Sequence, residues 1–284
     1  MKIVRFGPAG QEKPGMIDET GQLRDLSAHL PDFGGEWLDP ARLNGLKDLD
    51  VDALPLVSGA PRLGVPVAGT RQFIAVGLNY TDHAEEAGMA VPAEPILFTK
   101  AVSCLQGPND DVRRPRGSTK MDWEVELAIV IGKRASYVEK AEALAHVAGL
   151  AVCDDLSERE YQLERLGSWD KGKGCDTFGP VGPWLVTLDE VGDPQNLAMW
   201  LDVNGRRMQT GNTGTMIFDC ATIVSYVSQF MVLLPGDIIT TGTPPGVGMG
   251  MKPPVFLKEG DVIELGIEKL GTQRHTVFAW NHGL

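Results

Sequence analysis

The chain has 284 residues, of which 43% are hydrophobic, so it can bury a full core in one large domain with a small companion. Its formal net charge of −12 argues against nucleic acid and against an anionic membrane surface as partners. A local metal ion or a Lys/Arg cluster would still permit an anionic substrate.

The start of the chain has no basic segment followed by an apolar one, so we expect no signal peptide. The most apolar stretch, 221–234, is too short and too polar to span a bilayer. The four cysteines are scattered without CxxC spacing, which favours reduced thiols and a cytoplasmic location. A catalytic cysteine is possible, but isolated cysteines are more often buried in a core.

Residues 1–68 predict a small N-terminal α/β domain. They contain a strand at Lys2–Phe6, a hairpin over 15–26, and short helical patterns at 27–30 and at 39–49. Asp39 and Pro40 suit the N-cap and first position of the second helix. Because 58–69 is rich in Gly and Pro, we interpret it as a linker and place a second domain at 69–284.

The second domain predicts many strands and few long helices. Strands are expected at 72–78, 95–100, 122–133, 147–152, 236–243, 261–267 and 274–278, with a hairpin over 197–208 about Asn204-Gly205. Helices are expected at 81–88, 137–145, from Ser157 onward and at 222–234. This order favours a β-rich α+β fold over a parallel doubly wound sheet.

Two carboxylates lie in the apolar strand 122–133. Glu124 and Glu126 are two positions apart, so they point to the same face. Buried side by side they would repel each other, and a hard divalent cation would compensate. The alternative is an edge strand with one solvent-facing side.

A second candidate for chemistry lies on the helix at 81–88. His83 and Glu86 are three positions apart and share a helix face, so the carboxylate can orient the imidazole as a general base. The alternative is an exposed helix face with an incidental histidine. The glycine-dense stretch 167–182 contains Lys173, but it has neither GxGxxG nor GxxxxGK[ST] spacing, so we reject a nucleotide site.

Five motifs, taken in order, resemble the fumarylacetoacetate hydrolase family. They are Asn-Tyr-x-Asp-His-x-x-Glu (79–86), Trp-Glu-Val-Glu-Leu (123–127), Asp-x-Ser-x-Arg-x-x-Gln (155–162), Gly-Lys-Gly-x-Asp-Thr-Phe (172–178) and Thr-Gly-Thr-Pro-x-Gly-Val-Gly (241–248). The resemblance implies a mixed β-sandwich roll with short helices, a divalent metal (Mg²⁺ or Mn²⁺) and a homodimer. The N-terminal segment looks like that of members that cleave 2,4-diketo-3-deoxy sugar acids, such as the L-rhamnonate and L-fuconate derivatives.

The resemblance also implies roles for individual residues. The metal ligands would be Glu124, Glu126 and Asp155, and His83 with Glu86 would activate water. Lys173 would neutralise a substrate oxyanion. The substrate contacts would be Arg159, Gln162, Thr243, Lys100 and Tyr80.

The function that this resemblance implies is metal-dependent hydrolysis of a C–C bond in a 2,4-diketo acid. The small-molecule oxoacid would yield pyruvate and a carboxylic acid such as lactate. Alternatives on the same site are an oxaloacetate decarboxylase, a dienoate isomerase, a hydratase or a ureidoglycolate lyase. A non-catalytic small-molecule binding protein is a further alternative, although the presence together of His83, Glu86 and the three carboxylates argues against it.

Overall fold

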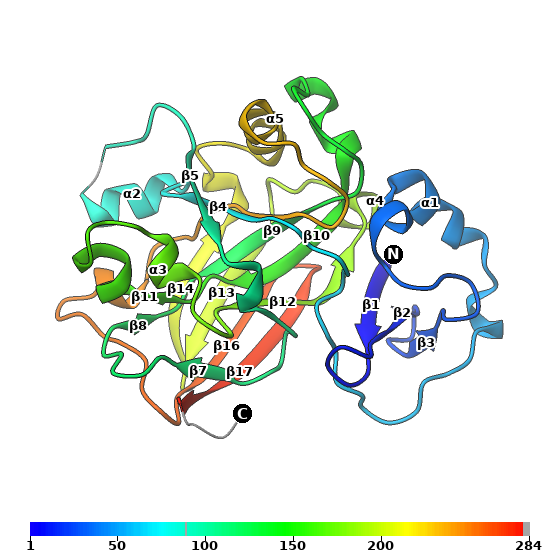
Figure 1. The fold of residues 1–284 in the computed structure, drawn as a ribbon, viewed down its shortest axis with the longest axis horizontal. Helices are drawn as coiled ribbons and strands as arrows, with labels where there is room; N and C mark the ends of the chain where they lie inside the picture. The colour runs from blue at the N-terminus through cyan, green and yellow to red at the C-terminus, as the bar shows by residue number, and fades with distance from the viewer. Residues whose placement is uncertain (89, 281–284) are drawn as a thin grey trace.

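The structure, a computed structural model, describes residues 1–88 and 90–280, and within them it is a β-rich α+β fold (Figure 1). The strands are β1 Lys2–Phe6, β2 Lys13–Ile17, β3 Leu23–Asp25, β4 Phe73–Gly77, β5 Ile96–Lys100, β6 Leu105–Gln106, β7 Val112–Arg114, β8 Met121–Asp122, β9 Val125–Ile131, β10 Val147–Asp154, β11 Ser157–Glu158, β12 Gly179–Val186, β13 Ala198–Val203, β14 Arg206–Asn212, β15 Ile238–Thr240, β16 Val262–Ile267 and β17 Gly271–Ala279. The α-helices are α1 Pro40–Gly45, α2 Thr81–Ala87, α3 Asp170–Lys173, α4 Leu188–Val191 and α5 Cys220–Phe230. A π-helix covers Glu160–Glu164, and short 3-10 helices cover Gly35–Leu38, Leu46–Asp48, Val51–Ala53, Val102–Cys104, Lys140–His146, Thr213–Thr215 and Gly248–Gly250.

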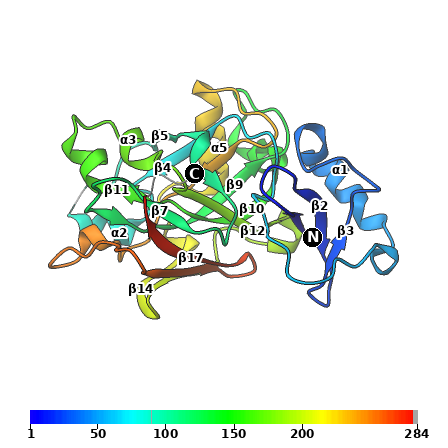
Figure 2. The same ribbon diagram turned by 60° about the horizontal axis from the view of Figure 1, so that its bottom comes forward.

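Two sheets form a sandwich. The larger sheet has the strand order β3-β2-β1-β12-β10-β9-β15-β4-β5, with β6 beside β12, and the smaller one has the order β14-β13-β16-β17-β7. Strands β9 and β10 of the larger sheet contact β13, β16 and β17 of the smaller one, and Figure 2 displays β14 and β17 in front of the larger sheet. The predicted β-rich α+β fold is confirmed.

The strand β9, which bears Glu126 and directly follows Glu124, lies inside the larger sheet. All seven residues of β9 are buried, and the strand pairs antiparallel with both β10 and β15. The edge-strand alternative is therefore wrong. A β-branched apolar run without alternation is what a strand covered on both faces requires.

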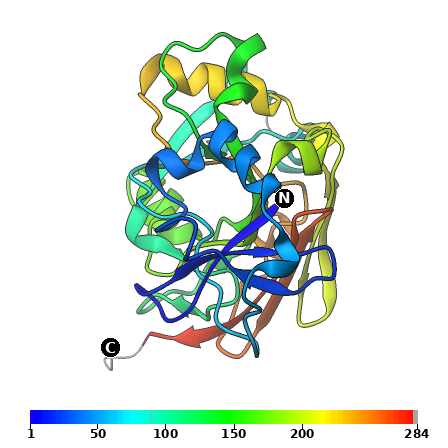
Figure 3. The same ribbon diagram turned by 90° about the vertical axis from the view of Figure 1, so that its right-hand side faces the viewer.

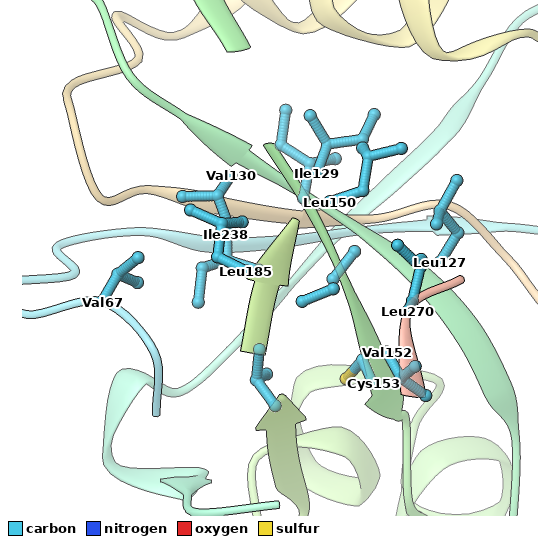
Figure 4. Packing of buried hydrophobic residues seen from close by; sticks show 14 of the residues in the cluster. Val67, Leu127, Ile129, Val130, Leu150, Val152, Cys153, Leu185, Ile238 and Leu270 are labelled. Atoms are coloured by element: carbon cyan, nitrogen blue, oxygen red, sulfur yellow. The ribbon is translucent and has the colours of Figure 1, made fainter. Parts of the chain in front are cut away.

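The apolar side chains of these strands belong to the buried core. Leu127, Ile129, Leu150, Val152 and Leu185 are buried and cluster in Figure 4. Fully burying one such side chain contributes roughly 1.5–3 kcal/mol. The core thus holds β9 and β10 rigidly, and their ends carry the site described below.

The N-terminal segment continues the larger sheet, because β1 pairs antiparallel with β12. Its helices and strands lie together at one end of the molecule (Figure 1), which faces the viewer in Figure 3 (blue). The predicted hairpin is confirmed as β2–β3, and Asp39 caps α1 by accepting a hydrogen bond from Ala41 N at 2.9 Å. The domain boundary at residue 68 stays a prediction.

Three predicted helices differ in the structure. Residues 27–29 form only a turn, in which the Asp25 carboxylate accepts a hydrogen bond from Ser27 N. The helix expected at 137–145 is a 3-10 helix at Lys140–His146. Ser157 begins strand β11 instead of a helix, because it pairs with Asp122 of β8, and the helical turn starts only at Glu160.

Other local predictions are confirmed. The hairpin β13–β14 turns at Asn204 and Gly205, whose φ angles of 52° and 72° match a two-residue turn of type I′. Helix α5 lies where a core helix is expected and begins at an Asp219 cap. In the part of the chain that the structure describes, no helix has the length and apolar character needed to cross a bilayer.

Candidate active site

The carboxylates Glu124, Glu126 and Asp155 meet at one end of β9 and β10. In the antiparallel register Glu126 is opposite Cys153, and Asp155 N donates to Glu124 O at 2.9 Å. Strand pairing alone therefore brings Asp155 beside the two glutamates. One oxygen from each of the three lies within 4.8 Å of the others, and all three residues are buried.

Three buried cations surround this triad. Lys173 Nζ, from α3, lies 2.6 Å from Glu124 Oε2 and 2.7 Å from Asp155 Oδ2. Lys100 Nζ, at the end of β5, lies 2.6 Å from Asp155 Oδ1. The Arg159 guanidinium contacts Glu124 Oε1 at 2.6 Å. Burial alone would lower the pKa of Lys100, but the pairing with Asp155 outweighs it and raises this pKa.

The pKa values of the two glutamates are shifted in opposite directions. Burial tends to raise the pKa of Glu124, but Lys173 and Arg159 outweigh it and bring this pKa to about 2. Burial, and next the charges of Asp155 and Glu124, raise the pKa of Glu126 well above its ordinary value. The Glu126 carboxyl accepts a hydrogen bond from Gly242 N at 2.8 Å, and among the described residues it has no ion pair within 4.0 Å. It is the member of the triad that lacks a compensating charge.

Helix α2 places His83 beside Glu86. His83 Nδ1 lies 3.2 Å from Glu86 Oε2, as the spacing of three residues predicts. The Glu86 carboxylate also accepts hydrogen bonds from Gly246 N, with 3.2 Å to each oxygen, so the backbone holds the orienting group. The left-handed residue Gly88 (φ 63°) ends the helix, as predicted.

The dyad and the triad line one cavity of about 460 Å³. Its polar surface also includes Lys173, Arg159 and Gln162. The remaining wall is apolar, formed by Val76, Leu78, Ile96, Phe98, Leu163, Trp169, Val247 and Met249. Helices α2 and α3 lie together at the end of the molecule opposite the N-terminal segment (Figures 1 and 2), and both contribute to this cavity.

The structure corrects the positions expected for some substrate-binding residues. Tyr80 is fully buried and its hydroxyl lies 3.3 Å from Met199 Sδ, so it is a core residue outside the cavity lining. Lys100 is also outside that lining, and its Nζ contacts the Asp155 carboxylate. Thr243 does line the cavity, but its hydroxyl donates to Val125 O at 2.9 Å and accepts from Gln209.

Arg159 and Gln162 lie together at the cavity surface. Arg159 Nη1 donates to Gln162 Oε1 at 3.0 Å, although a π-helical turn rather than an α-helix separates the two residues. Both line the cavity, which is compatible with the substrate contacts expected of them. Those contacts stay a prediction.

Two buried carboxyls without a predicted role also support the site. Asp122 accepts hydrogen bonds from Gly248 N at 2.7 Å and from Arg159 Nε at 2.8 Å, so it fixes the guanidinium that contacts Glu124. Asp154 accepts a hydrogen bond from Glu124 N at 3.1 Å, and burial raises its pKa to about 8. Their signal in the sequence was adjacency to the triad, because Asp122 lies two residues before Glu124 and Asp154 directly precedes Asp155.

The donor set fits a divalent cation. Mg²⁺ and ions of similar hardness prefer carboxylate oxygens, and three such oxygens converge here around a glutamate that lacks an ion pair. Three protein ligands would leave further coordination positions for water or substrate. The sandwich and the triad thus define a β-rich protein with a candidate divalent-cation centre.

Comparisons with known proteins agree with this class. Residues 72–278 match the family described as Fumarylacetoacetate (FAA) hydrolase C-terminal. A Burkholderia orbicola (strain MC0-3) protein named as a hydrolase is 59% identical over 274 residues, and the match covers 96% of this chain and 97% of that protein.

Two solved structures extend the comparison to the fold. The fumarylacetoacetate hydrolase from Exiguobacterium antarcticum has a TM-score of 0.87 at 37% identity, covering 99% of this chain and 100% of that one. The maleylpyruvate hydrolase from Sphingobium sp. SYK-6, solved with manganese(II) and pyruvate, has a TM-score of 0.81 at 29% identity, with 99% and 100% covered. The chain belongs to the fumarylacetoacetate hydrolase family, whose solved members include hydrolases and isomerases.

Proposed function

We propose that the chain hydrolyses a C–C bond in a 2,4-diketo acid and releases pyruvate and a carboxylic acid. One observation carries this proposal: the His83–Glu86 pair and the Glu124, Glu126 and Asp155 triad line the same cavity. A base for water and a site for an anion-stabilising cation are the two devices that this hydrolysis needs. The Sphingobium relative, named a maleylpyruvate hydrolase and solved with manganese(II) and pyruvate, supports the same chemistry.

The chain's own groups divide the reaction between them. Glu86, held by Gly246 N, orients His83, and His83 takes a proton from water. The water oxygen bonds to C4 of the diketo acid, the C3–C4 bond breaks, and its electron pair passes into the enolate of pyruvate. A proton then adds to C3, so the products are pyruvate and the acid that carries the acyl group.

We assign to Lys173 the stabilisation of the negative charge that develops on the enolate. Its Nζ is fixed between Glu124 and Asp155, so little reorganisation is needed during the reaction. A divalent cation held by the triad would act as a Lewis acid toward the oxoacid oxygens. We propose Mg²⁺ or Mn²⁺ for this position, since the carboxylate set suits both.

The finer substrate prediction is a 2,4-diketo-3-deoxy sugar acid with lactate as the second product, and it depends on the likeness of the N-terminal segment. The oxaloacetate decarboxylase, isomerase and ureidoglycolate lyase alternatives use the same acidic site, but they leave the His83–Glu86 pair without a role as a base for water. A hydratase would use such a base, but it would leave every C–C bond of its substrate intact. A homodimer and a cytoplasmic location also stay predictions.

Pyruvate release tests the proposal. We expect purified protein to form pyruvate from acetylpyruvate and from the diketo sugar acid with Mg²⁺, and to lose this activity with EDTA. His83→Ala should also be inactive while it still binds the metal, measured by calorimetry. Equal activity in His83→Ala and the wild type would refute the role of the dyad.

A further inference from the structure

We propose that the distal wall of the cavity selects an uncharged acyl group with an apolar end and rejects a second carboxylate. This inference rests on the proposed function, because it concerns the acyl half of the same diketo acid. It separates this chain from a hydrolase of maleylpyruvate, whose acyl half carries a carboxylate of its own.

The distal wall is an apolar surface that starts at Phe98, whose ring centroid lies 5.4 Å from Lys173 Nζ, and continues along β5 to Ile96, away from Lys100 and the triad. Phe98 of β5 and Trp169, just before α3, make an edge-to-face pair with ring centroids 5.2 Å apart. Trp169 also packs against Gly77, where an added Cβ would lie 2.6 Å from the indole. Ile96 and Leu163 extend the same surface. The close contact with Gly77 holds the indole in place, so its apolar ring stays in the cavity wall.

The charges that line the cavity are already assigned. Among the described lining residues, the permanent cations are Lys173 and Arg159, which are 2% and 4% exposed. Lys173 is paired with Glu124 and Asp155, and Arg159 is paired with Glu124 and Asp122. Both cations therefore lie at the triad end of the cavity, where Lys173 Nζ also lies 5.4 Å from the centroid of the Phe98 ring at the inner edge of the apolar wall.

Two further cations close to the wall are directed elsewhere. Arg165 is paired with Glu160 at 2.8 Å and lies over the Tyr161 ring, and Lys171 Nζ donates to Arg165 O at 2.8 Å. Neither lines the cavity. A second substrate carboxylate placed beyond Phe98, against Trp169 and Ile96, would thus lose its hydration without a pairing cation among the described lining residues of that part of the wall, which is costly.

An uncharged acyl end meets no such cost. A propyl, methyl or similar group gains from burial against the apolar wall. The lactoyl end of a 6-deoxy sugar acid also meets this condition, because it is uncharged and ends in a methyl group.

The test compares two substrates of equal length that differ only at the distal end. Butanoylpyruvate ends in CH₃ and succinylpyruvate ends in a carboxylate, and kcat/KM is measured for both with Mg²⁺. We expect a preference for butanoylpyruvate on the order of 100-fold or more, as for pockets that exclude an unpaired polar group. Equal values, or a preference for succinylpyruvate, would overturn the inference.

A variant pair locates the effect at the wall. Leu163→Arg places a cation at a lining position that is 45% exposed, and it should reduce the preference at least tenfold. Leu166→Arg is the matched control, because Leu166 is fully exposed and does not line the cavity, and it should leave the preference unchanged. An unchanged preference in Leu163→Arg would place the selection elsewhere and overturn the assignment to this wall.

Binding keeps the two proposals separate. If neither compound yields pyruvate, the proposed function fails, and the dissociation constants of both compounds, measured by calorimetry, still decide this inference. Tighter binding of butanoylpyruvate supports the apolar wall. Equal or tighter binding of succinylpyruvate refutes it.

Discussion

Replacing Glu126 by Gln should abolish most of the increase in folding stability that Mg²⁺ gives to the wild-type protein. In the site, Asp122, Glu124, Glu126 and Asp155 face three cations, so one formal negative charge remains when all are ionised. A divalent cation compensates that charge. At a Mg²⁺ concentration 100 times the dissociation constant, binding to the folded state alone adds about 2.7 kcal/mol to the free energy of unfolding.

This stabilisation is large enough to measure. With a change in Tm of roughly 2–4 °C per kcal/mol for a chain near this size, wild-type protein should gain roughly 5–11 °C in Mg²⁺ relative to EDTA. Glu126→Gln should gain less than about 1 °C on the same scale, because it removes the uncompensated carboxylate.

Without metal, Glu126→Gln should not be less stable than the wild type. Glu126 has a raised pKa in the folded protein, so its tendency to ionise in the unfolded chain favours unfolding above the ordinary carboxyl pKa. Glutamine removes that cost, so in EDTA at pH 7 the variant should be at least as stable as the wild type. This advantage should disappear when the pH falls below the ordinary pKa of a glutamate.

Differential scanning calorimetry in Mg²⁺ and in EDTA measures both effects. Glu86→Gln is the matched control, because this carboxylate lines the same cavity but lies outside the triad. It should keep the full gain in Tm with Mg²⁺. A Glu126→Gln protein that gains as much as the wild type would refute the assignment of Glu126 as a metal ligand.

Three further predictions follow from single contacts. His83→Gln should lose pyruvate formation and keep the Mg²⁺-dependent rise in Tm; loss of that rise would make His83 a ligand rather than a base. Lys100→Met should lower the free energy of unfolding in urea by about 3–5 kcal/mol, because it leaves Asp155 buried without its 2.6 Å partner. The control Lys120→Met, at a solvent-exposed pair, should lower the free energy of unfolding far less, and equal losses in the two variants would contradict the importance of burial. Asp18→Asn should destabilise the protein at pH 7, and progressively less as the pH falls below the ordinary pKa of an aspartate, measured by urea unfolding: hydrogen bonds from Thr20 and Arg24 lower the pKa of folded Asp18, so its contribution is complete above the unfolded-state pKa and is lost as the pH falls toward the folded-state pKa.

The sequence predicted the parts of the site that depend on local spacing. His83 and Glu86 meet because three residues nearly complete a helical turn, and Glu124 and Glu126 share a face because strands alternate. Asp155 was assigned through the family resemblance, because its position beside Glu124 depends on strand pairing between segments about 30 residues apart. Strand register is a property of the sheet and cannot be read from one segment.

Long-range contacts also explain the errors. The turn at Glu160–Glu164 reads as a helix from Ser157, but pairing of Ser157 with Asp122 extends the backbone first. Tyr80 follows a strand and precedes the His83 helix, so the sequence places it near the site, yet its ring turns into the core against Met199. The apolar wall combines residues from β5, the π-helix and the turn before α3, and no short pattern in the sequence joins them.

A product balance tests hydrolytic cleavage most directly. Pyruvate, the acyl-derived carboxylic acid and CO₂ are quantified together in one reaction with butanoylpyruvate and Mg²⁺. Hydrolysis predicts one pyruvate and one butanoate for each substrate consumed, with no CO₂ and no product when EDTA replaces the metal. CO₂ release, or consumption of substrate without pyruvate, would contradict C–C hydrolysis. The first result would indicate a decarboxylase and the second an isomerase.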